Sequence, residues 1–115
     1  MDRQVVKVFR ALGDSSRIRI VKMLEERELC VCEVREVLNL SNSTVSKHLS
    51  ILHDAGLITQ TKEGKWVNYG INSKSESPFV RSVVSLLKSS LHDDESVRTD
   101  TEFVRRVDRN KICRV

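Results

Sequence analysis

The sequence predicts a mainly α-helical domain that carries one β-hairpin. Apolar residues recur at helical spacing in five segments between residues 2 and 91. Between residues 57 and 71 the apolar period changes from 3.6 to 2, and a glycine lies in the middle of that stretch. A chain of 115 residues makes one domain with a modest core, so a partner chain would add to its stability.

Two helices are expected at the start of the chain. The first covers residues 2–12, where apolar residues form one face, and Gly13 ends it. The second follows an Asp14 or Ser15 cap and runs to Arg27. Its core stripe is Ile18, Val21 and Leu24. Together these helices would form a small apolar support for the residues that follow.

A short helix over residues 30–38 then leads through a tight turn into a helix over residues 41–56. Asn39 suits the end of the short helix, Ser41 suits the cap of the next, and Gly56 suits a left-handed end. The second helix would bury Val45, Leu49 and Leu52. Its other face is polar: Asn42, Ser43, Thr44, Ser46, Lys47, His48 and Ser50. Such a face suits base edges and phosphates in a major groove, although an ordinary surface helix has the same pattern.

The β-hairpin is expected from residues 57–62 and 66–71. Residues 63–65 contain a glycine and would form the turn. This places Lys62 and Lys65 at the tip. Because a two-stranded hairpin is marginal alone, it should pack on the neighbouring helices.

A last strongly apolar helix is predicted for residues 79–91, after a loop that holds the chain's only proline. Its apolar face is wide, which favours pairing with the same helix of a second chain, assisted by residues 2–12. Extra burial within one chain is the alternative. The predicted homodimer interface consists of Val5, Phe9, Leu12, Val80, Val84, Leu87 and Leu91.

Charge divides the chain at residue 91. Residues 1–91, the expected folded domain, carry 14 basic and 10 acidic side chains, whereas residues 92–115 carry six of each. The basic excess gives mild support for a polyanionic partner. Residues 92–115 are expected to form a charged, mobile tail that can dock, with a short helix after a Thr99 or Asp100 cap.

The composition also limits the class of protein. No apolar run reaches the length of a membrane span, and the N-terminus lacks the features of a signal peptide, which predicts a cytoplasmic protein without a membrane partner. Three cysteines make a poor disulfide framework. The chain shows no glycine-rich phosphate loop and no nucleophile elbow, so an enzyme is not expected.

The order of elements is that of a winged helix-turn-helix, and the residues resemble one family in particular. ALGDSSRIRIVKML, ELCVCEV, LNLSNSTVSKHLSILHDAGLI and KWVNYGI resemble the ArsR/SmtB metalloregulatory repressors over roughly residues 5–91. The resemblance implies a homodimer that binds twofold, double-stranded operator DNA and leaves it when an effector binds. It places Asn42, Ser43, Thr44, Ser46, Lys47 and His48 in the major groove, and Lys62 and Lys65 at phosphates. Ser41 would cap the helix and could also contact a phosphate. For His48, a hydrogen bond within the domain is an equal alternative.

Cys30 and Cys32 are the candidate effector ligands. On one regular helix their side chains would point about 200° apart, so both can reach one ion only if the first turn is unwound. In the family that it resembles, ELCVC is typical of sensors that bind trivalent arsenic or antimony through two or three thiolates. Arg35 occupies the position of the usual third cysteine. Three options follow: two thiolates suffice, Cys113 completes the site, or the sulfurs serve another purpose.

Three functions follow from these residues. The leading prediction is a repressor of an arsenic resistance operon that As(III) or Sb(III) releases. The alternatives keep the repressor but assign the cysteines to cadmium or lead, or to a redox or reactive-sulfur signal. No structural metal or organic cofactor is expected, because paired Cys or His clusters for zinc are missing from the sequence.

Overall fold

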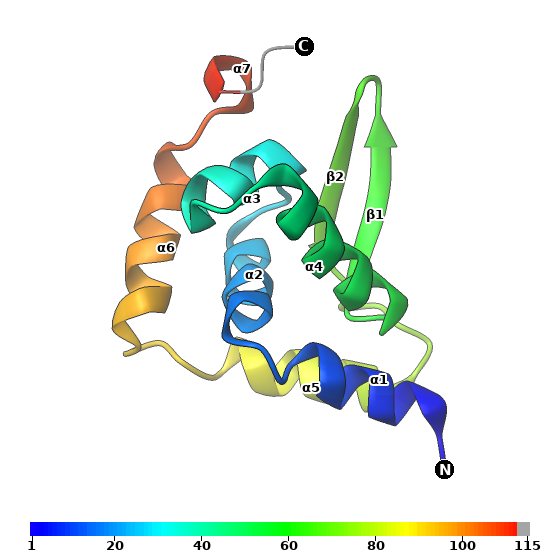
Figure 1. Cartoon of the computed structure of the whole chain (residues 1–115). Helices are drawn as coiled ribbons and strands as arrows, with labels where there is room; N and C mark the ends of the chain where they lie inside the picture. Colours follow the sequence, from blue (N-terminus) through cyan, green and yellow to red (C-terminus); the bar gives the residue numbers. More distant parts are fainter. Residues whose placement is uncertain (113–115) are drawn as a thin grey trace.

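The computed structural model describes residues 1–112, and it contains seven helices and one two-stranded sheet in that part of the chain (Figure 1). The elements are α1 (Arg3–Ala11), α2 (Ser15–Glu26), α3 (Val31–Leu38), α4 (Asn42–Asp54), β1 (Ile58–Glu63), β2 (Trp66–Ile71), α5 (Pro78–Lys88), α6 (Glu95–Arg106) and α7 (Arg109–Ile112). Through α5 this is the predicted order of four helices, a hairpin and a helix. The winged helix-turn-helix fold is therefore confirmed.

The sheet is a regular antiparallel hairpin. Its register runs from Ile58 opposite Ile71 to Glu63 opposite Trp66. That pairing leaves two residues for the turn, and the first of them, Gly64, has a φ of 58°. Glycine adopts this left-handed conformation without steric cost, as a tight hairpin requires. The hairpin extends away from the helices beside α4 and forms the wing (Figure 1).

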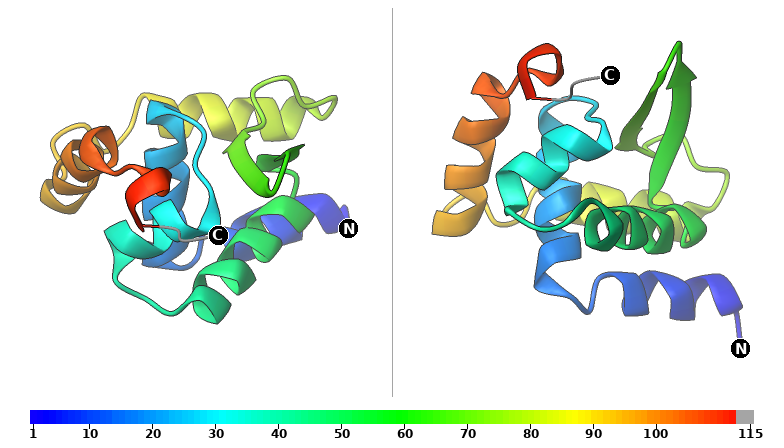
Figure 2. Two further views of the ribbon diagram at one scale, coloured as in Figure 1. Left: turned by 90° about the horizontal axis from the view of Figure 1, so that it is seen from above. Right: turned by 45° about the horizontal axis from the view of Figure 1, so that its top comes forward.

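One core joins the helices to the base of the wing. Its fully buried large side chains include Ile20 and Met23 of α2, Leu49 and Leu52 of α4, and Leu57 just before β1. Helix α2 lies at the centre, with α1, α3, α4, α5 and α6 arranged around it (Figure 2). The predicted stripe of α4 is correct, because Val45, Leu49 and Leu52 are all 0% exposed.

The helix ends follow the predicted capping residues in the first half of the chain. The Asp14 carboxylate accepts a hydrogen bond from the Arg17 N–H at 3.1 Å and caps α2. Asn39 ends α3 in the left-handed conformation, with a φ of 55°. Gly56, with a φ of 85°, follows α4. These positions have local backbone requirements that few residue types meet, which explains why the sequence predicts them.

The segment after residue 91 differs from the expectation. Its helix α6 begins at Glu95, not after Thr99 or Asp100, because the Asp94 carboxylate accepts the Val97 N–H at 3.0 Å and caps it there. Residues 95–106 pack on α2, so this part of the expected tail is docked on the domain (Figure 2). Val104 belongs to the main core.

The apolar face of α5 is shared between the core and the surface. Val80 is 0% exposed within one chain and therefore offers no surface to a partner. Val84 is also buried, and Leu12 and Leu87 pack against the same core. Part of the wide face is thus explained by burial within the chain. Phe9 and Leu86, each 64% exposed, and Leu91, 39% exposed, remain on the surface.

Candidate nucleic-acid interface and cysteine site

The recognition helix α4 is fixed at its start by Ser41. The Ser41 Oγ accepts a hydrogen bond from the Thr44 N–H at 3.2 Å and donates one to the Thr44 Oγ1 at 2.9 Å. The Asn39 N–H donates to the Arg35 carbonyl at 2.8 Å and closes the preceding helix. The turn between α3 and α4 is therefore held by backbone and capping bonds on both sides.

The polar face of α4 is open to solvent. Its exposed residues are Asn42, Ser43, Thr44, Ser46, Lys47 and Ser50. Because the apolar stripe on the other side is completely buried, the orientation of this face is fixed by the core. An exposed and rigidly oriented row of hydroxyl, amide and ammonium groups is suited to a polyanion with donor and acceptor edges.

His48 differs from the rest of the face. It is half-buried, and its Nδ1 lies 3.2 Å from the Arg17 Nη1. Because a guanidinium only donates, Nδ1 must accept, which places the imidazole proton on Nε2. Arg17 also donates to the Ala11 carbonyl at 2.7 Å and the Arg10 carbonyl at 3.2 Å. His48 therefore makes a hydrogen bond within its own domain, which was one of the two alternatives for this residue. Through these contacts Arg17 links α1, α2 and α4.

The wing tip carries the two predicted lysines. Lys62 and Lys65 are both exposed, and the Lys65 Nζ lies 5.6 Å from the centre of the Trp66 ring. Glu63 lies between them and pairs with Arg109 of α7. The Arg109 guanidinium lowers the pKa of the Glu63 carboxyl by hydrogen bonding and by its charge. The acidic group of the tip is therefore compensated within the chain, while both lysines are exposed.

Cys30 lies outside helix α3, at its N-cap position. Its backbone is extended, with a φ of −94° and a ψ of 171°, and the helix begins one residue later. The two candidate cysteines are therefore not two positions of one regular helix, and the 200° separation does not apply to them. Cys30 is a free thiol, only 3% exposed, and Cys32 is half-buried in the first turn of the helix.

The buried carboxylate of Glu33 holds the Cys30 backbone in place. One oxygen, Oε1, accepts the Cys30 N–H at 3.0 Å, and the other, Oε2, accepts from the Arg27 Nη1 at 3.0 Å. Burial raises the pKa of the Cys30 thiol, and the nearby Glu33 charge raises it further, although the Glu33 N–H acts in the opposite direction. In the resting protein this thiol therefore keeps its proton at neutral pH.

The cysteine pair is not part of a larger preformed metal site in the residues that the structure describes. Between residues 1 and 112, no three His, Cys, Asp or Glu side chains are grouped so that they could hold a metal ion. Cys113, the candidate third ligand, lies outside the described residues. In the same part of the chain, no helix is both long and apolar enough to cross a membrane.

Several contacts of the site are not expected from the sequence reading. The Glu33 contact had a local signal, since an acidic residue three positions after a cap is the capping-box pattern, here with Cys30 as the cap. Arg17 lies within the second predicted helix and Arg27 at its end, and no local pattern predicts the partners of either residue. Arg109 contacts Asn68 and Glu63, which lie 41 and 46 positions earlier in the chain. No local pattern predicts such a pairing.

Fold and site together define a winged-helix protein with an exposed polar recognition helix and a cysteine pair at the entry to the helix-turn-helix. The family model for "Bacterial regulatory protein, arsR family" matches residues 14–60, which include α2, α3 and α4. The chain is 34% identical over 106 residues to the arsenical resistance operon repressor of Escherichia coli K12, covering 91% of this chain and 82% of that protein.

Two further proteins show the same likeness. A homologue of the cadmium resistance regulatory protein CadC from Staphylococcus aureus is 38% identical over 92 residues, covering 79% of this chain and 71% of that protein. The solution structure of a homodimeric winged helix-turn-helix domain from Mycobacterium bovis, a possible ArsR-family regulator, superposes with a TM-score of 0.63. Its identity is 26%, and the match covers 76% of this chain and 83% of that one.

The chain belongs to the ArsR family of bacterial regulatory proteins. It is therefore a transcriptional regulator and not an enzyme. The family includes regulators of both arsenical and cadmium resistance.

Proposed function

We propose that this protein is an operator-binding repressor of an arsenic resistance operon, released when As(III) or Sb(III) binds Cys30 and Cys32. The observation that carries the proposal is the position of Cys30, an extended and buried residue directly before the first helix of the helix-turn-helix. A ligand that draws its sulfur toward Cys32 must move the start of α3. Relatives named for arsenical or arsenic resistance support arsenic as the inducer, and the relative named for cadmium resistance makes cadmium the alternative.

The DNA-binding surface would combine the exposed face of α4 with the wing tip. Asn42, Ser43, Thr44, Ser46 and Lys47 are exposed on one helix that the core orients, as major-groove reading requires. Lys62 and Lys65 would neutralise phosphates without reading sequence. Two such surfaces on a homodimer would match a twofold operator, with Phe9, Leu86 and Leu91 as the exposed apolar residues that a second copy would cover. Binding to chromosomal DNA would place the protein in the cytoplasm.

The chemistry of release requires no oxidant. When arsenite condenses with a thiol, an As–S bond forms and an As–O bond breaks, and the hydroxyl leaves as water with the thiol proton. Soft sulfur ligands select such thiophilic ions over magnesium or calcium. Because Cys30 is protonated and buried, the reaction also requires the Leu29–Cys30 segment to open, which makes binding and structural change one event.

Operator release measured with single-cysteine variants tests the proposal. Labelled DNA from beside the gene is titrated with reduced protein and then challenged separately with arsenite, antimonite, cadmium, lead, zinc, peroxide and polysulfide. We expect release by arsenite and antimonite, lost in Cys30→Ser and in Cys32→Ser. Retained release in Cys113→Ser indicates a two-thiolate site, and lost release a three-thiolate site.

Other outcomes would replace the proposal. Release by cadmium or lead alone would make the protein a sensor of another thiophilic metal, and release by peroxide or polysulfide alone would make it a redox or sulfur sensor. If the reduced protein binds no operator DNA at low salt, the repressor function itself is wrong.

A further inference from the structure

The backbone beside Cys30 is directly hydrogen-bonded to the wing. The Leu29 N–H donates to the Tyr69 carbonyl at 3.0 Å, and the Tyr69 N–H donates to the Leu29 carbonyl at 2.8 Å. These two bonds form an isolated antiparallel β-bridge between Leu29 and Tyr69 of β2. The Leu29 side chain is fully buried, which fixes this junction in the core. A displacement of Cys30 therefore acts on a residue that is already paired with the wing.

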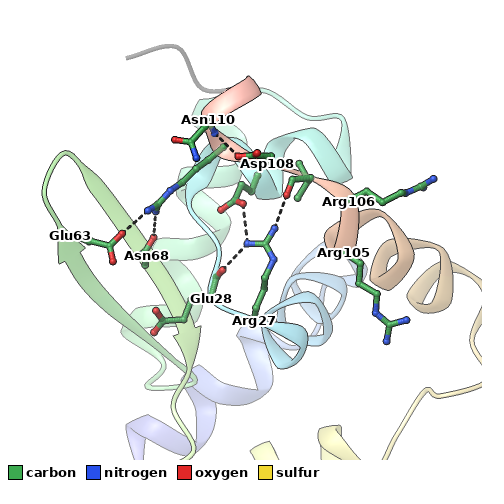
Figure 3. A pocket seen from close by; sticks show the side chains of 11 residues that line it. Arg27, Glu28, Glu63, Asn68, Arg105, Arg106, Asp108 and Asn110 are labelled. Atoms are coloured by element: carbon green, nitrogen blue, oxygen red, sulfur yellow. Dashed lines mark hydrogen bonds and ion pairs between the residues drawn. The ribbon is translucent and has the colours of Figure 1, made fainter.

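A second connection runs from Cys30 through side chains to the end of α6. Glu33 accepts the Cys30 N–H with one carboxylate oxygen and Arg27 with the other. The Arg27 Nη2 donates to the carbonyls of Val104 at 3.0 Å and Val107 at 2.8 Å. Carbonyls at a helix C-terminus have no partner within the helix, so Arg27 satisfies acceptors that would otherwise need water. Figure 3 shows Arg27 reaching into this space between α2, α3 and α6.

The C-terminal segment, residues 104–112, also contacts the wing. It does so through Arg109, two residues after Val107. The Arg109 Nη1 donates to the Asn68 Oδ1 at 2.9 Å, and the Arg109 Nη2 pairs with Glu63. Its guanidinium carbon lies 4.7 Å from the centre of the Trp66 ring, which is cation–π distance. Asn68 is buried in the middle of the hairpin, opposite Thr61, whereas Glu63 is exposed near the wing tip, so one arginine contacts both the middle and the tip of the hairpin.

An open pocket of about 720 Å³ lies between the wing, α3 and the C-terminal segment, and its lining includes Arg27, Glu33, Glu63, Asn68 and Arg109 (Figure 3). The pocket is rich in arginine, which at first suggests an anion site. However, Arg27, Arg105 and Arg109 are already paired with carboxylates or carbonyls of the chain. Contacts of this kind are better suited to holding the wing and the C-terminal segment together than to binding a ligand.

We infer that Glu33, Arg27 and Arg109 are positioning residues that connect Cys30 to the wing. The inference rests on the proposed function in taking arsenite as the signal at Cys30. When Cys30 is drawn away, Glu33 loses one of its two donors and Arg27 loses its fixed carboxylate. The end of α6 then loosens, and Arg109 releases Trp66 and Asn68. The wing would lose its fixed position beside the DNA while the contact face of α4 keeps its residues unchanged.

Trp66, the only tryptophan of the chain, makes this movement measurable. Arsenite is added to the reduced full-length protein while the arsenic–thiolate absorbance and the Trp66 emission are recorded together. We expect the wild-type emission to move toward that of Arg109→Gln as the absorbance rises, and Arg109→Gln to change little further. Arg109→Gln should also lower the arsenite-dependent loss of operator affinity by about fivefold, the low end of ordinary coupling between sites.

Arg106→Gln is the matched control for this titration. Arg106 is an exposed arginine on the same segment, but its guanidinium lies 5.9 Å from the Phe103 ring and not at the wing. It should keep the wild-type response in emission and in release. If the absorbance rises in wild-type protein while Trp66 emission stays constant, the connection from Cys30 to the wing does not exist.

A second arm needs no inducer and separates this inference from the proposed function. Glu33→Gln keeps an acceptor for the Cys30 N–H but loses the charge that holds Arg27, so Trp66 emission should shift toward that of Arg109→Gln in untreated protein. Arg27→Gln should do the same, and Glu36→Gln, an exposed substitution on α3, should not. Circular dichroism verifies that each variant is folded. Should arsenite produce no absorbance, the proposed inducer is wrong, and the inference stands or falls on whether Glu33→Gln and Arg27→Gln shift the emission.

Discussion

Helices α4 and α6 share a pattern of buried and polar positions but use their polar residues in opposite ways. Each has a capped start, three buried residues and otherwise mostly polar side chains. On α4 the polar residues face solvent, apart from the contact of His48 with Arg17. On α6, Asp100 is 4% exposed and accepts two hydrogen bonds from Arg19 of α2, at 2.8 and 2.9 Å. Arg105 pairs with Glu26 of α2.

The difference shows that a polar helix face has no single meaning in a sequence. Asp100 and Arg105 of α6 meet opposite charges on α2 and hold the helix on the domain. The exposed groups of α4 contribute little to the fold and are available to DNA. Substitutions on α6 should therefore change the free energy of unfolding, and substitutions on the α4 face and wing should change affinity for DNA.

The largest effect is expected from Asp100→Asn. It removes the charge from a bidentate pair in which Asp100 is buried and the Arg19 side chain is 33% exposed. Because Arg19 can still reach water, we expect a loss of about 2 kcal/mol in the free energy of unfolding, as for a hydrogen bond to a charged group. Urea unfolding followed by circular dichroism measures it.

Asp93→Asn provides the control, because Asp93 is exposed in the loop before α6. It should leave the unfolding midpoint unchanged. The operator affinity of folded Asp100→Asn protein should equal that of the wild type. A midpoint for Asp100→Asn equal to that of Asp93→Asn would show that the Arg19 pair does not stabilise the domain.

The sequence predicts one of the two helices much better than the other. Ser41, Val45 and Gly56 mark the ends and buried stripe of α4 through local rules of capping and spacing, and the structure agrees at each position. The docking of α6 depends on Asp100 meeting Arg19, 81 residues away, and local rules cannot predict which distant charges will pair. For the same reason the connection from Cys30 through Glu33 and Arg27 to Val107 could not be predicted, and Cys30 itself precedes the helix that the sequence predicts to contain it.

The next largest effect is expected at Ser41, where stability and DNA binding meet. Ser41→Ala removes the acceptor of the Thr44 N–H at the start of α4 and should cost about 1 kcal/mol of unfolding free energy. Ser41→Asp is the matched variant, because aspartate also caps helices well but adds a negative charge. It should restore stability while weakening operator binding. Equal operator affinities for Ser41→Asp and the wild type would place Ser41 away from the phosphates.

A smaller effect is expected at the wing tip. Lys62→Gln removes one exposed ammonium group that is proposed to meet a phosphate. The slope of log affinity against log salt should fall by about 0.9 for each protomer that makes the contact. The unfolding midpoint should stay constant. Lys74→Gln, an exposed lysine in the loop before α5, is the control. If both variants change the slope equally, the wing tip has no particular role in DNA binding.

The smallest effect concerns acid and the contact of Arg109 with the wing. The pKa of Glu63 is lowered below its ordinary 4.5 by hydrogen bonding and charge from Arg109. This contact therefore contributes stability above pH 4.5 and loses it as the pH falls through the lowered value. Trp66 emission should change over that range as Arg109 is released, in a direction that matches Arg109→Gln. In Glu63→Gln this acid-dependent change should be missing. A wild-type change centred above pH 4.5, or one that persists in Glu63→Gln, would mean that another group controls how the C-terminal segment holds the wing.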